Sequence, residues 1–248
     1  MKSHFQYRVN LLKACEILYK QGHLSGMDGN VSVRINDEMI LTTPTGRNKG
    51  WLVEEELVLC GMDGVSLENG KRPSTEIKMH LEVYKKRSDA QAVVHCHPIF
   101  ATIYAASLKN LDGCYLTESI VAIGSVPKAE LALPGTHQLA ESIAPLVEDN
   151  ESILLANHGA ISFGQNLEVA VSRMESLEHF AKLSYYLELA NMQNEPSQEL
   201  VDQLQALRPN YGFNQKFTPC QKKVVNSQHA DRLDVDQITK LVLAELSK

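Results

Sequence analysis

Two histidines, His95 and His97, stand at the end of an apolar run with Cys96 between them. Side chains on a β-strand alternate between its two faces, so both imidazoles are expected on one face and Cys96 on the other. His158 also follows an apolar run. Three neutral imidazoles around an open position are the ligand set of a catalytic zinc site. These three histidines are the candidate metal ligands, and the alternative is that they are ordinary core or surface histidines.

Composition narrows the class of protein. Hydrophobic residues make up 44% of the 248 residues and charged residues 22%, which is typical of a globular protein with a sizeable core. The net charge of −6 gives no sign of a nucleic-acid or anionic-membrane partner. We expect no membrane span and no secretory leader, because no apolar run is long enough. The five cysteines are Cys15, Cys60, Cys96, Cys114 and Cys220. Their odd number and scatter predict reduced thiols in the cytoplasm.

The periodicity of apolar residues predicts the elements that carry these histidines. Helices are expected over 4–22, 74–86, 99–107, 138–147, 167–191 and 198–207. Besides the strand with the histidine pair, strands are expected over 31–35, 39–41, 57–60, 119–123 and 152–156. Ser74 is the expected N-cap of the second helix, with Glu76 in its first turn. Helices alternate with hairpin-like strand pairs. This order predicts an α/β protein, a single-domain layered α/β/α sandwich with a mixed, largely antiparallel central sheet.

Five short motifs together resemble a known family. They are Gly29–Arg34, Thr43–Gly46, Pro73–Glu76, His95–His97 and Asn157–Gly159. Their order and spacing resemble those of the class II aldolase/adducin family over roughly residues 5 to 213. Each motif alone is more typical of a turn than of a ligand site, so the resemblance depends on the whole set.

The resemblance implies a role for each matching residue. His95, His97 and His158 would bind Zn²⁺ or another divalent ion, and Glu76 beside the metal would serve as acid and base. The phosphate-binding positions that it implies are Asn30, Thr45, Gly46, Ser74 and Thr75. Ser74 and Thr75 stand at a predicted helix N-terminus, whose free N–H groups favour an anion.

The implied activity is that of a zinc-dependent aldolase. It would cleave L-fuculose 1-phosphate, or L-rhamnulose 1-phosphate, to dihydroxyacetone phosphate and L-lactaldehyde. Related pentulose-phosphate epimerases carry Asp where this chain has Glu76, which favours the aldolase. A decarboxylase or epimerase acting on another sugar (acid) phosphate, and a non-catalytic adducin-like scaffold, stay open as alternatives.

Further residues and partners follow from the same resemblance. A second acid–base group is expected at Tyr115, supplied to a neighbouring subunit of a homotetramer, with Glu118 as the alternative. Tyr211 resembles a tyrosine that covers the site. His80 lies one helical turn after Glu76 and is expected to be a core histidine or one that supports the ligands.

The C-terminal part of the chain has a different character. We predict a catalytic domain over 1–213, a polar linker over 214–231 and an amphipathic helix over 232–248. The last segment resembles the encapsulation peptides that direct enzymes into bacterial microcompartments. Its apolar stripe is too small to fold alone, so it would bind a shell protein or, alternatively, its own tetramer. The expected location is the cytoplasm, within a microcompartment if the shell interpretation holds.

Overall fold

A computed structural model describes residues 2–211, 213 and 217–220. Its centre is a seven-stranded sheet in the order β3-β2-β1-β4-β7-β6-β5. The strands are β1 (Asn30–Arg34), β2 (Met39–Thr42), β3 (Val58–Gly61), β4 (Ala92–Cys96), β5 (Lys128–Ala129), β6 (Ser152–Leu155) and β7 (Gly159–Gly164). Neighbouring strands are antiparallel except β5 and β6, which are parallel. The predicted mixed, largely antiparallel sheet is confirmed.

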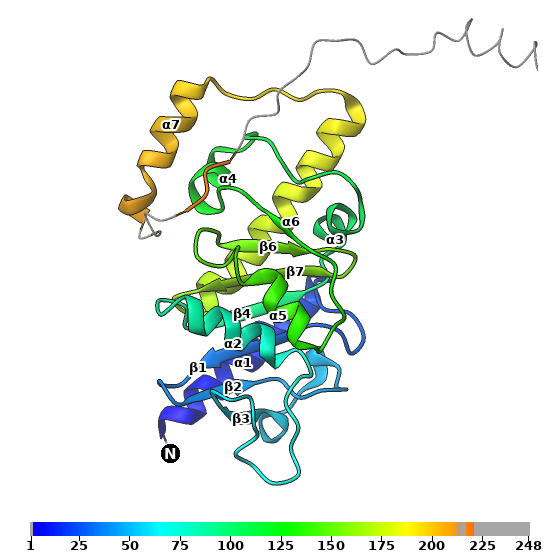
Figure 1. The fold of residues 1–248 in the computed structure, drawn as a ribbon, viewed down its shortest axis with the longest axis vertical. Coiled ribbons are helices and arrows are strands. Elements are labelled where there is room, and N and C mark those ends of the chain that lie inside the picture. The colour runs from blue at the N-terminus through cyan, green and yellow to red at the C-terminus, as the bar shows by residue number, and fades with distance from the viewer. Residues whose placement is uncertain (1, 212, 214–216, 221–248) are drawn as a thin grey trace, which may run out of the picture.

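Helices cover both faces of this sheet (Figure 1). They are α1 (Lys2–Lys20), α2 (Ile77–Lys86), α3 (Ile99–Ala106), α4 (Thr117–Ala122), α5 (His137–Ile143), α6 (Leu167–Ala190) and α7 (Gln198–Ala206). One buried cluster joins α1, α3 and α6 to the sheet, and a second joins α2 and α5 to its other face. The chain therefore forms the layered sandwich that was predicted. None of the described helices is both long and apolar enough to cross a bilayer.

Strand β4 shows how the alternation of side chains separates the two cores. Val94 and Cys96 pack into the cluster with α1, α3 and α6, whereas Val93 packs into the cluster with α2 and α5. Since His95 alternates with Val94 and Cys96, it lies on the face covered by α2. This confirms that Cys96 faces away from the histidine pair.

Three local predictions differ from the structure. The segment 119–123 is not a strand: its first four residues belong to helix α4 and Ile123 is the C-cap, because Ile120 packs against Val201 of α7 rather than beside a neighbouring strand. Strand β7 was not expected from the sequence, although it forms a hairpin with β6. The N-cap of α2 is Glu76 rather than Ser74. Ser74 lies two residues before Glu76, and its Oγ accepts a hydrogen bond from the backbone N–H of Glu76 at 3.3 Å.

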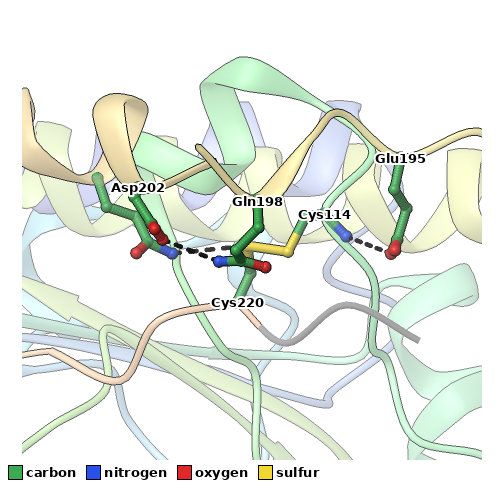
Figure 2. Close-up of a disulfide and its surroundings, with 6 residues drawn as sticks. Cys114, Glu195, Gln198, Asp202 and Cys220 are labelled. Carbon is green, nitrogen blue, oxygen red and sulfur yellow. Dashed lines mark hydrogen bonds between the residues drawn. A yellow bond between two sulfur atoms is a disulfide. The ribbon is translucent and has the colours of Figure 1, made fainter. Parts of the chain in front are cut away.

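The prediction of five reduced thiols is wrong for two of them. Cys114 and Cys220 form a disulfide (Figure 2), whereas the other three cysteines are free and buried. The pair is 106 residues apart in sequence, so spacing alone could not reveal it. It forms because the chain returns to the body after α7, where the backbone N–H of Ser125 donates to the carbonyl of Thr218 at 2.8 Å.

Part of the predicted linker packs on the domain. The guanidinium of Arg208 lies 3.8 Å from the centre of the Phe217 ring. Arg208 is itself buried, together with Arg87 and Arg173, around the carboxylate of Glu151. The predicted helix over 232–248, and the rest of the predicted linker, lie outside the described residues.

Candidate active site

The three candidate histidines converge on one point. His95 lies on β4, His97 follows the end of that strand, and His158 lies in the turn between β6 and β7. Their ring centres are 4.7 to 5.0 Å apart. One ring nitrogen from each lies within 4.8 Å of the others, and the two Nε2 atoms of His95 and His97 are 3.2 Å apart. Two segments that are distant in the chain therefore together form a group of side chains that could hold a metal ion.

The residues on either side of His158 explain how its ring reaches the cluster. Asn157 has a φ of 54°, in the left-handed region, and its N–H donates to the carbonyl of Ala105 at 3.0 Å. A Cβ atom on Gly159 would lie 2.5 Å from both the Cys96 carbonyl oxygen and the Cδ2 atom of His97. Only glycine lets β7 approach β4 this closely, so the glycine of the Asn-His-Gly motif is a steric requirement of the site.

The protonation of the imidazoles suits metal binding. His95 Nδ1 lies 2.9 Å from the Ala160 carbonyl oxygen, to which a proton on Nδ1 can be donated, and its Nε2 is directed at the other two rings. Burial and the neighbouring imidazoles lower the pKa of His97 to about 4. Burial also lowers the pKa of His158. Neutral imidazoles with bare nitrogens are what a metal ion requires.

Glu76 lies against two of these rings. Its Oε2 atom is 3.3 Å from His95 Nε2, and its Oε1 atom is 3.3 Å from His158 Nε2. Burial acts to raise the pKa of Glu76, but the positive charges that His95 and His158 carry when protonated, with a 2.8 Å hydrogen bond from Asn30, outweigh it and hold the pKa below its usual range. Three imidazole nitrogens and one carboxylate oxygen form a donor set that fits Zn²⁺ or a similar divalent ion.

The same cluster opens into a cavity of about 220 Å³. His97, His158 and Glu76 line it. The residues predicted to bind phosphate line it as well, namely Asn30, Thr45, Gly46, Ser74 and Thr75. Gly46 has a φ of 67°, and a Cβ atom there would meet nothing within 4 Å, so its backbone borders open space. Every predicted metal-ligating and phosphate-binding residue thus lies in one site, with the buried ring of His95 adjoining the rings of His97 and His158.

The cavity also contains residues that the sequence did not reveal. Lys49 is only 4% exposed, and its Nζ donates to the backbone carbonyl of Met27. Burial lowers the pKa of this lysine, although the charges of Asp28 and Glu76, among others, act to raise it. Lys49 comes three residues after the Gly46 loop, and that spacing from a glycine-containing anion loop is the signal that could have found it. Asp28 lies 3.7 Å from His97 Nδ1.

The predicted second acid–base groups do not line this cavity. Tyr115 packs on Phe180, with ring centres 6.4 Å apart, and burial raises its pKa to about 12. Tyr211 is exposed and borders a different hollow, together with Glu118. A single chain therefore brings neither tyrosine to the histidine cluster, and a contribution from a second copy stays a prediction.

Sequence comparison agrees with this architecture. The family described as "Class II Aldolase and Adducin N-terminal domain" matches residues 9–185, most of the chain. The chain belongs to this family. Among its relatives, an L-fuculose phosphate aldolase of Methanococcus maripaludis is 33% identical over 178 residues, which cover 72% of this chain and 95% of the relative. A 3-oxo-tetronate 4-phosphate decarboxylase of Escherichia coli is also 33% identical, over 73% of this chain and 86% of the relative.

Solved structures of the class II aldolase and adducin family have the same fold. An L-fuculose 1-phosphate aldolase aligns over 83% of this chain and 96% of its own, with a TM-score of 0.75 and 28% identity. YgbL of Escherichia coli, described as a putative aldolase/epimerase/decarboxylase, aligns over 81% and 98%, with a TM-score of 0.73 and 28% identity. The fold of a class II aldolase is thereby shown for this chain, and the relatives differ in the reaction they catalyse.

Proposed function

We propose that this chain is a divalent-metal-dependent lyase that breaks a carbon–carbon bond in a phosphorylated sugar. One observation carries the proposal: a buried carboxylate, five residues suited to phosphate and two of the three convergent imidazoles line one cavity, and the third imidazole, that of His95, adjoins them. The site therefore offers groups suited to a phosphate beside groups that would hold a divalent ion. A scaffold protein of this family would have no need for such a set.

Each group in the cavity has a chemical task. A divalent ion bound by the histidines supplies Lewis-acid polarisation of a substrate carbonyl. The hydroxyls of Ser74 and Thr75, with the N–H groups near the start of α2, bind the phosphate dianion. Glu76 takes and returns the substrate's protons, because this residue lines the cavity and its buried Oε1 atom has no hydrogen-bond donor among the described residues.

The favoured reaction is aldol cleavage of L-fuculose 1-phosphate or L-rhamnulose 1-phosphate. The hydroxyl at C4 loses its proton as the C3–C4 bond breaks, and the electron pair passes to C3 beside the C2 carbonyl. A proton is then added at C3, which gives dihydroxyacetone phosphate and L-lactaldehyde. The similarity to L-fuculose phosphate aldolases supports this substrate class.

Decarboxylation of a 3-oxo sugar-acid phosphate is the second candidate. The 3-oxo-tetronate 4-phosphate decarboxylase of Escherichia coli is 33% identical to this chain, as is the L-fuculose phosphate aldolase of Methanococcus maripaludis. Both reactions leave an electron pair beside a carbonyl, so the same histidines and Glu76 would serve either one. A pentulose-phosphate 4-epimerase is less favoured, because of the glutamate at position 76.

The deciding experiment offers the purified protein three substrates in parallel. They are L-fuculose 1-phosphate, L-rhamnulose 1-phosphate and 3-oxo-tetronate 4-phosphate, each with and without a chelator, followed by release of triose phosphate or CO₂. We expect triose phosphate from a deoxyketose phosphate, lost with chelator and restored by Zn²⁺. CO₂ together with triose phosphate from 3-oxo-tetronate 4-phosphate, with no turnover of either deoxyketose phosphate, would establish the decarboxylase instead. No turnover in the metal-loaded protein would contradict both.

The assembly and the C-terminal segment complete the proposal. A homotetramer would bring Tyr115 of one copy to the cavity of another, and Tyr211 would cover it. Residues 232–248 would bind a microcompartment shell protein. Deletion of residues 231–248 is then expected to leave catalysis and the oligomeric state unchanged and to abolish association with the shell, whereas a terminal helix docked on its own tetramer would destabilise the enzyme when deleted.

A further inference from the structure

A chain of buried hydrogen bonds leads from the protein core to the carboxylate of Glu76. Asn30 Nδ2 donates to Glu76 Oε2 at 2.8 Å, and His80 Nε2 lies 2.6 Å from Asn30 Oδ1. On the other side of the imidazole, His80 Nδ1 lies 2.7 Å from Ser32 Oγ. Ser32 Oγ lies in turn 2.8 Å from the hydroxyl of Tyr84. All five residues are buried. The burial of His80 agrees with the prediction of a core histidine at this position.

The donors in this chain all point toward the carboxylate. The amide nitrogen of Asn30 faces Glu76, so its carbonyl oxygen accepts from His80 Nε2, which must carry the proton. Burial lowers the pKa of His80 to about 3, so the ring is neutral and its Nδ1 is bare. That nitrogen accepts from the hydroxyl of Ser32, whose oxygen accepts from Tyr84.

This arrangement treats the two oxygens of Glu76 differently. Oε2 is held by Asn30, whereas Oε1 has no hydrogen-bond donor among the described residues. We propose that His80 and Ser32 are positioning residues: they fix the Asn30 amide so that its N–H, and not its carbonyl, faces Glu76. The inference rests on the proposed function, in which Glu76 exchanges protons with the substrate.

The position of the proton on the His80 imidazole decides the orientation of the Asn30 amide. If the donor to His80 Nδ1 is lost, the ring can carry its proton there and leave Nε2 bare. A bare Nε2 would attract the amide nitrogen of Asn30 and turn the amide over. The carbonyl of Asn30 would then face the carboxylate of Glu76, and the two oxygens would repel each other.

The test compares two buried serines in the same sheet. Ser32→Ala removes the donor to His80. Ser162→Ala is the matched control, because Ser162 is equally buried but donates to the backbone carbonyl of Ala170 at 2.8 Å. We expect Ser32→Ala to lower kcat about 10- to 100-fold, with KM within about 3-fold and metal content unchanged. Ser162→Ala is expected to keep kcat within about 2-fold.

Two further measurements distinguish a specific effect on the Asn30 amide from a nonspecific disturbance of the fold. In a Glu76→Gln background, Ser32→Ala should lower the residual rate no further, because residues that act through one group are not additive. ¹⁵N NMR of the imidazoles should show the proton of His80 on Nε2 in the parent protein and partly on Nδ1 in Ser32→Ala. If Ser32→Ala fails to fold, Tyr84→Phe replaces it, with an expected loss in kcat of about 3-fold or more.

The inference is overturned if both serine variants lose the same activity, or if the His80 proton lies on Nδ1 in the parent protein. Its failure is distinct from that of the proposed function. Suppose that the protein turns over none of the three substrates, but that the proton of His80 moves in Ser32→Ala as described. The lyase activity would then be refuted, and the role of Ser32 in the hydrogen-bond network would stand.

Discussion

Glu76 and His95 lie 3.3 Å apart, although one is at the start of a helix and the other is on the central strand of the sheet. This contact joins the candidate metal ligands to the turn proposed to bind phosphate, because Ser74 and Thr75 immediately precede Glu76 in the chain. A substrate that binds its phosphate at this turn is therefore held beside the candidate base. The predictions below test the parts of this arrangement one at a time.

Removal of one imidazole should remove the metal. His158→Ala is expected to lower bound Zn²⁺ from about one ion per chain to below about 0.1, because a catalytic site has three protein ligands. Elemental analysis after dialysis measures this directly. His179→Ala, which changes an exposed histidine outside the cluster, serves as the control. Full metal content in His158→Ala would contradict the three-histidine site.

The close approach at Gly159 predicts a steric effect. In Gly159→Ala, the new Cβ would lie 2.5 Å from the carbonyl of Cys96, so β7 must shift away from β4. We expect a loss of about 3 kcal/mol in the free energy of unfolding, with weaker metal binding. Gly22→Ala, where the φ is 77° and nothing lies within 4 Å, should cost only about 1 kcal/mol. Equal losses in urea titrations would refute the steric argument.

The positive charge of Lys49 should strengthen binding of the substrate's phosphate group. Lys49→Met keeps the length of the side chain and removes its positive charge from the cavity. We expect KM for the phosphorylated substrate to rise about 10-fold or more, with a much smaller change in kcat. Lys13→Met changes an exposed lysine on α1 and should leave both constants unchanged. A KM in Lys49→Met equal to that of the parent protein would exclude this role.

Burial of His80 predicts a dependence of stability on pH. Its pKa falls to about 3 in the folded protein from 6.5, so between these values the unfolded chain binds a proton that the folded chain does not. The free energy of unfolding should therefore fall with falling pH, by up to about 1.4 kcal/mol per pH unit from this side chain. Urea unfolding of the metal-free protein from pH 6.5 to 4.5 measures the slope. His80→Asn should flatten it, and Ser162→Ala should not.

The disulfide should stabilise the folded chain. Because it closes a loop between residues 106 apart, its loss is expected to cost about 2 to 4 kcal/mol of unfolding free energy. A reductant should lower the denaturation midpoint of the parent protein and have no effect on Cys114→Ser. Mass spectrometry of an unreduced digest should find the peptides of Cys114 and Cys220 joined. Separate peptides under oxidising conditions would refute the pairing.

Short-range patterns predicted most of the architecture. The 3.6-residue period gave the helices α1, α3 and α6, and the period of two on β4 put His95 and Cys96 on opposite faces. Local sequence patterns gave wrong predictions where packing against segments far away in the chain decides the local structure. The run 119–123 has the β-branched composition of a strand, but its available neighbour is helix α7, so it is helical.

The sequence by itself determined the family, the candidate ligands and the motifs of the site, because these depend on residue identity and spacing. Only the tertiary structure decided which residues share a cavity. It added Lys49, and it left Tyr115 and Tyr211 outside the cavity of their own chain. It also revealed the Cys114–Cys220 pair and the chain of hydrogen bonds behind Glu76. These features depend on contacts between segments far apart in the chain, which packing of the sheet and helices fixes and no local pattern encodes.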